Sequence, residues 1–260
     1  MGAINVTLMD AAGNWRDTWI GLARNPLRSA IVIIALGALD EATVRLIVAV
    51  TESLPPETFS YPQYALAYQA LTVVVTLLLC AASVAGAYFV VSNDRRISRS
   101  ADSETPPPKF GRWMRRAVLG WCLIIIGSGI ISLAIQFVVM FLGIEGTDDL
   151  DGIDWVSGLF YALLQALLAA FLLLRVPDAA GRPATWPRRS SLFASYIILF
   201  LGATLLMYVF WLGDGSLSTA WNLRAYYFIT SLVTVLSVLL SCSASRRFAD
   251  RDDDSAIVFD

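Results

Sequence analysis

Residues 71–91 read LTVVVTLLLCAASVAGAYFVV and contain no charged side chain. A helix needs about 20 mostly apolar residues to cross the ~30 Å hydrocarbon core of a bilayer, and this stretch supplies that length. An isolated strand in lipid would leave its backbone groups without partners, so a helix is the expected form. The run therefore predicts a transmembrane helix, which an apolar flank extends back to residue 64.

Five further stretches have comparable length and hydropathy. Together with the first, they predict an all-α polytopic membrane protein with six spans at about 27–50, 64–91, 117–142, 156–176, 190–212 and 222–243. Asn25-Pro26 is typical of a helix start, with proline at the first helical position. The composition agrees, because 57% of the 260 residues are hydrophobic and 15% are charged, whereas a soluble domain carries about 25% charged residues.

Consecutive spans are expected to pair as three helical hairpins within one transmembrane domain, residues 27–245. A cytoplasmic segment (1–26) precedes this domain and an acidic cytoplasmic tail (246–260) follows it. The tail is dense in aspartate, and such charge clusters usually stay solvated, so we expect irregular structure there.

Basic residues are distributed very unevenly between the predicted loops. Seventeen of the 19 lie before or at the start of span one, between spans two and three, at the end of span four or between spans four and five, or after span six. The other loops carry carboxylates, and the two exceptions are Arg45 and Arg224. By the positive-inside rule, both termini face the cytoplasm. We therefore expect a multi-pass protein of the plasma (inner) membrane of a bacterium.

The N-terminal segment has apolar residues at helical spacing. They are Leu8, Ala12, Trp15, Trp19 and Leu22. Steps of three and four place them on one helical face, which predicts an amphipathic helix lying on the inner leaflet. This helix would either orient the first span or dock a partner protein.

Part of this segment also carries a resemblance to other proteins. Trp15-Arg16-Asp17-Thr18-Trp19 leads to Arg24-Asn25-Pro26, and hairpins follow. In this the chain resembles six-span prokaryotic membrane proteins, including the membrane domain found beside some glycerophosphodiester phosphodiesterases. The soluble catalytic domain of those enzymes has no counterpart in the sequence. The resemblance thus implies a fold and a membrane location but no activity.

Three charged residues, Asp40, Glu41 and Arg45, fall inside the first predicted span. Each costs about 2.5–3.5 kcal/mol at the centre of a span, so they must be paired, hydrated or turned toward other helices. Glu41 precedes Arg45 by four residues, which favours a helical ion pair. Asp40 lies about 100° round the helix from Glu41, and Arg224 is its candidate partner.

Three interpretations of this candidate intramembrane polar site stay open. Asp40, Glu41, Arg45 and Arg224 could form an ion or proton site, or part of a polar translocation path. Alternatively, the ion pair is structural and Asp40 is a protonated acid. In the third interpretation, residues 40–50 form an amphipathic extension near the membrane surface.

Other chemical signals are missing from the sequence. It contains no histidine, and its three cysteines lie in apolar runs. Phosphate-loop, Rossmann, HExxH, CxxC and GxSxG motifs do not occur. We therefore expect no catalytic residue, cofactor, metal or nucleic-acid partner. The sequence favours a non-enzymatic scaffold, anchor or assembly component in the lipid bilayer, acting with protein partners or as a homo-oligomer. The alternative is a small transporter or channel that uses the charges of the first span.

Overall fold

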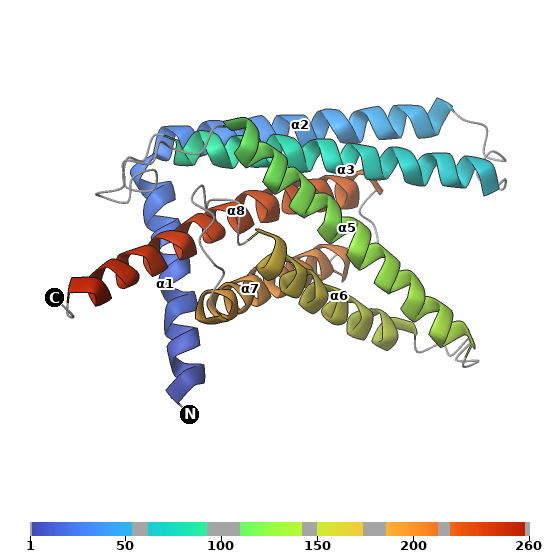
Figure 1. The fold of residues 1–260 in the computed structure, drawn as a ribbon. Coiled ribbons are helices and arrows are strands. Elements are labelled where there is room, and N and C mark those ends of the chain that lie inside the picture. The colour runs from blue at the N-terminus through green and yellow to red at the C-terminus, as the bar shows by residue number, and fades with distance from the viewer. Residues whose placement is uncertain are drawn as a thin grey trace.

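The structure is a computed structural model that describes residues 2–53, 62–92, 110–141, 150–173, 186–212 and 219–257. Within these ranges the regular structure consists of seven α-helices (Figure 1). They are α1 (Gly2–Arg24), α2 (Pro26–Ser53), α3 (Pro62–Val91), α5 (Phe110–Phe141), α6 (Leu150–Leu172), α7 (Trp186–Leu212) and α8 (Thr219–Ile257). The prediction of an all-α protein is confirmed for this part of the chain.

Six of the helices, α2 to α8, cover the stretches in which spans are predicted. The expected span ends at 142 and 174–176 lie outside the described helices. By length and composition, α3, α5, α7 and α8 can each cross a membrane, and α6 has a shorter apolar stretch, Leu159–Leu172. Helix α2 is as long as these, but Asp40, Glu41 and Arg45 interrupt its apolar sequence. The chain thus has the helices of a membrane protein, and the count of six spans stays a prediction.

Helix α8 is the central helix of the bundle. It packs against α1, α2, α3 and α7, and Figure 1 shows it passing between the α2–α3 pair and α7. Of its apolar stretch 72% is buried, against 28–39% in the other three candidate spans. The expected hairpin partners, α2 with α3, α5 with α6, and α7 with α8, also pack against each other.

Small residues bring neighbouring helices close together. Ala162, Ala166 and Ala170 form a buried row on α6, and α6 packs against both α5 and α7. On α3, a Cβ at Gly86 would lie 2.7 Å from Cγ1 of Val32 on α2. Such close approach of helix backbones is typical of packing inside a membrane.

Hydroxyl groups on α8 are buried where this helix packs against its neighbours. Thr234, Ser237 and Ser241 are each fully buried. The hydroxyl of Tyr196 on α7 donates to the backbone oxygen of Ser237 at 2.9 Å, and it lies 2.6 Å from Oγ of Ser241. Hydrogen bonds of this kind join α7 to α8 inside the apolar core.

Helix α1 turns its polar side toward the bundle. Asp10, Asn14 and Thr18 are buried, with at most 3% of each residue exposed. Leu8 and Trp19 of the predicted apolar face point outward, 55% and 56% exposed. Ala12 is exposed as well, whereas Trp15 and Leu22 are partly buried against the core. The helix crosses α7 and the C-terminal part of α8 (Figure 1), and its outward surface is mainly apolar, although Asn5 and Arg16 are exposed as well.

The acidic tail differs from the expectation. Helix α8 continues through Arg246 to Ile257, so the prediction of irregular structure is wrong over that range. The sequence between Ser243 and Ile257 contains neither glycine nor proline. Nothing in it therefore stops a helix that has already formed. Residues 258–260 lie outside the described part of the chain.

Candidate functional site

Two ion pairs meet at Glu41 on α2. Its Oε1 accepts a hydrogen bond from Nε of Arg45, one turn further along the helix, at 2.9 Å. This is the pair that the i, i+4 spacing predicts. The Arg45 side chain is 76% exposed and that of Glu41 is 34% exposed, so the pair lies on the outer surface of the described bundle.

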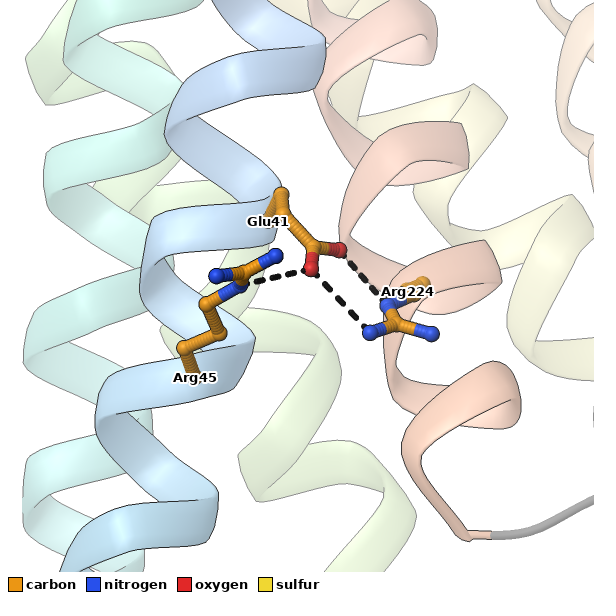
Figure 2. A network of polar contacts seen from close by, with 3 residues as sticks. All are labelled: Glu41, Arg45 and Arg224. Atoms are coloured by element: carbon orange, nitrogen blue, oxygen red, sulfur yellow. Dashed lines mark hydrogen bonds and ion pairs between the residues drawn. The ribbon is translucent and has the colours of Figure 1, made fainter.

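Arg224, in the second turn of α8, makes a two-point contact with the same carboxylate (Figure 2). Its Nε donates to Oε2 of Glu41 at 2.6 Å, and its Nη2 donates to Oε1 at 3.0 Å. The paired geometry is the one that suits a planar guanidinium and a carboxylate. The structure therefore joins Arg224 to Glu41, whereas the sequence had offered it as a partner for Asp40.

Asp40 takes a different position from its neighbour Glu41. It is buried, with 2% of the residue exposed, and its Oδ1 accepts a hydrogen bond from Oγ of Ser231 on α8 at 3.0 Å. Its Oδ2 has no hydrogen-bond partner within the described residues. Since α2 contacts α8 here, Asp40 faces the central helix, while Glu41 sits at the edge of the same contact. The 100° step between them produces this difference.

No pattern in the sequence indicates Ser231 as the partner of Asp40. A serine within an apolar helix is usually an ordinary packing residue. Thr230, Thr234, Ser237 and Ser241 are the neighbouring hydroxyl residues on this helix. Thr230 donates to the backbone oxygen of Tyr226 on its own helix at 2.8 Å. Which residue of α8 faces Asp40 depends on how α8 is rotated about its own axis. The sequence does not specify that rotation.

A second charged cluster fastens α1 to α8. The guanidinium of Arg247 lies 4.0 Å from Oδ1 of Asp10 and 3.4 Å from Oδ2 of Asp17. It occupies the space beside Gly13, where a Cβ would overlap its atoms. The missing side chain of Gly13 thus allows the cation to lie between the two acids.

Uncharged polar groups continue this contact between helices. Nδ2 of Asn14 donates to Oγ of Ser195 on α7 at 3.3 Å. The hydroxyls of Thr18 and Ser243 on α8 share a hydrogen bond of 2.9 Å. All four residues are at most 8% exposed. Polar side chains of α1 therefore join it to α7 and α8. Because they are buried in these contacts, they do not form the polar face expected of a helix that lies on the membrane surface.

The described residues include few candidates for binding a metal or a cofactor. No group of three or more histidine, cysteine, aspartate or glutamate side chains that could hold a metal occurs among those residues. The three cysteines are free, with Cys80 and Cys242 buried. The polar side-chain contacts described above are thus made by carboxylates, guanidinium groups, hydroxyls and the amide of Asn14.

Comparison with known proteins finds no family model, no curated protein and no solved structure that matches this chain. The resemblance to six-span prokaryotic membrane domains therefore stays a prediction.

Proposed function

We propose that this chain is a six-span integral membrane protein that acts as a scaffold, anchor or assembly component and has no catalytic site. We place it in the inner membrane of a bacterium with both termini in the cytoplasm. The seventeen basic residues on one side of the predicted topology support this orientation. Outward apolar residues on the helices, such as Ile34, Leu78 and Val209, more than 60% exposed, suit contact with lipid.

The observation that carries the proposal is the use of polar side chains to join helices. Arg224 ties α8 to α2, and Arg247 ties α8 to α1. Tyr196 ties α7 to α8 in the same way. A bundle held by such contacts is suited to presenting a fixed surface, as an assembly component must. A catalytic centre would instead keep reactive groups free for a substrate.

The proposal is tested by the assembly state of the full chain. After extraction in mild detergent, size-exclusion chromatography with light scattering should give a homo-oligomer or a complex with a partner at a fixed ratio. Chemical cross-linking in intact membranes should capture the same neighbour. A monomer in both measurements would contradict a role in assembly.

A small transporter or channel is the second candidate, and one observation favours it. Asp40 is buried in α2 with an oxygen that lacks a hydrogen-bond partner among the described residues. A carboxylate placed in this way inside a span is a candidate for carrying a proton or a cation.

Proteoliposomes containing the wild-type chain should then conduct protons or monovalent cations. Asp40→Asn should abolish the flux, and Glu52→Gln, an exposed acid at the end of α2, should leave it unchanged. Equal flux in wild type and Asp40→Asn would rule this function out.

A further inference from the structure

Two arginines converge on one carboxylate oxygen at the contact between α2 and α8. Nε of Arg45 and Nη2 of Arg224 lie 2.9 Å and 3.0 Å from Oε1 of Glu41. Figure 2 shows the Glu41 carboxylate between the two guanidinium groups, in contact with both. With one acid and two bases, the cluster carries a net charge of +1.

The Arg45 side chain keeps hydrogen-bond donors available. Its bond to Glu41 uses Nε, and within the described residues no bond is made by its two Nη groups. Because the side chain is 76% exposed, these groups face the surroundings of the bundle. A guanidinium group with available planar donors is suited to binding a phosphate, and the Arg224 guanidinium adds a second positive charge at the same carboxylate.

The position of the pair along α2 suggests where such a phosphate would come from. Arg45 precedes the end of α2 at Ser53 by eight residues, or about 12 Å of helix. A long arginine side chain at that depth can extend toward the headgroup layer. Arg45 and Arg224 are also the two basic residues outside the arginine-rich side of the predicted topology, where the loops are acidic. These loops would repel a free anion from water, whereas a lipid phosphate is already held in the leaflet.

An apolar row lies next to the two arginines. Phe228 is one turn from Arg224 on α8 and 38% exposed, and Ile34 on α2 is 71% exposed. Between them, a Cβ at Gly37 would lie 3.8 Å from Cε2 of Phe228, so the glycine leaves the aromatic edge uncovered. Residues 34, 37, 41 and 45 share one face of α2 by helical spacing. This row, Ile34, Gly37 and Phe228, has the chemistry to contact an acyl chain.

We infer that Arg45 and Arg224, positioned by Glu41, form a binding site for the phosphate of a membrane phospholipid whose acyl chain lies along Ile34, Gly37 and Phe228. The inference relies on α2 and α8 crossing the membrane, as proposed above, and is independent of any assembly partner. A monomeric protein can therefore bind the lipid, and a failure of one proposal does not imply failure of the other.

The full-length protein, stripped of lipid in detergent, is titrated with phosphatidylglycerol and examined by native mass spectrometry. Arg45→Gln should weaken the binding of one lipid about tenfold, since it removes charge-assisted hydrogen bonds to the phosphate. Glu41 keeps its contact with Arg224 in this variant, so α2 and α8 stay joined. The matched control, Arg112→Gln, removes an exposed arginine at the opposite end of the predicted spans and should change the affinity by about twofold at most.

Two further measurements distinguish a lipid site from general charge attraction and from a site for free phosphate. Arg45→Lys keeps the charge but loses the planar fork, so its affinity should lie between those of wild type and Arg45→Gln. Inorganic phosphate at the same concentrations should bind much more weakly than the lipid. Equal losses in Arg45→Gln and Arg112→Gln, or full affinity in Arg45→Lys, would show general charge attraction and overturn the site. Inorganic phosphate binding as tightly as phosphatidylglycerol would overturn the lipid assignment.

Discussion

The hydrogen bond between Ser231 and Asp40 gives the sharpest test of the helix arrangement. Its atoms are 3.0 Å apart, and both residues are at most 2% exposed. Ser231→Ala removes the donor and leaves Asp40 buried without it. A hydrogen bond to a charged group contributes about 1.5–3 kcal/mol, whereas such bonds inside membrane proteins average ~0.6 kcal/mol and reach ~1.7. Between these values, we expect Ser231→Ala to lower the free energy of unfolding by about 1–2 kcal/mol.

The matched control is Ser237→Ala on the same helix. Ser237 is also buried, but its hydroxyl donates to the backbone oxygen of Thr234 in α8 itself, at 2.9 Å. Its removal breaks no side-chain bond between helices and should cost less than about 0.5 kcal/mol. Equilibrium unfolding from mixed micelles with increasing SDS, followed by circular dichroism, measures both variants.

A double-mutant cycle with Asp40→Leu completes the experiment. Once Asp40 is replaced by an apolar residue of similar size, Ser231 has no carboxylate to bind, so Ser231→Ala should then be nearly neutral. A coupling energy of about 1 kcal/mol is expected from the range for such bonds in membranes. If Ser231→Ala costs no more than Ser237→Ala, or if the coupling is zero, the placement of α8 against α2 is wrong.

Three other predictions concern the rest of the bundle. Arg247→Gln removes the cation between the two α1 aspartates, so amide hydrogen exchange in α1 should speed up about tenfold; unchanged exchange would mean that other contacts hold the helix. Gly86→Ala forces α2 away from α3 and should lower the free energy of unfolding by about 1–3 kcal/mol. Gly129→Ala, with open space around it, should leave the free energy of unfolding unchanged or raise it slightly. Similar effects at both glycines would contradict the close approach. A spin label at Leu8→Cys in lipid nanodiscs should be relaxed by oxygen but not by a water-soluble nickel chelate; relaxation by nickel would place this face of α1 in water.

The approximate positions of the helices could be predicted because long apolar runs are visible in the sequence, although α5 and α6 begin seven and six residues before the predicted spans and α8 ends 14 residues after its span. The span predicted at 64–91 became Pro62–Val91, and the one at 190–212 became Trp186–Leu212. The Glu41–Arg45 pair was equally accessible, since its two members are one helical turn apart.

Contacts between distant helices could not be predicted in the same way. Whether Arg224 meets Asp40 or Glu41 depends on how α2 and α8 are rotated, and no local pattern fixes that angle. Gly13 is a similar case. In the sequence, a glycine indicates only a weaker tendency to form a helix. In the structure its missing side chain makes room for Arg247. The inward polar side of α1 exists only because α7 and α8 offer it partners.

The central position of α8 has a consequence for how the protein is made. If α2 crosses the membrane as proposed above, it is inserted early in synthesis, and α8 emerges from the ribosome after the other described helices. Until then Asp40 has no Ser231, and Glu41 has Arg45 but no Arg224, so the acids of α2 are only partly compensated and its insertion is less stable. Nascent chains stalled before residue 224 should be poorly retained in the bilayer and open to membrane proteases. Under the proposed topology, the completion of α8 would therefore stabilise α2 in the membrane.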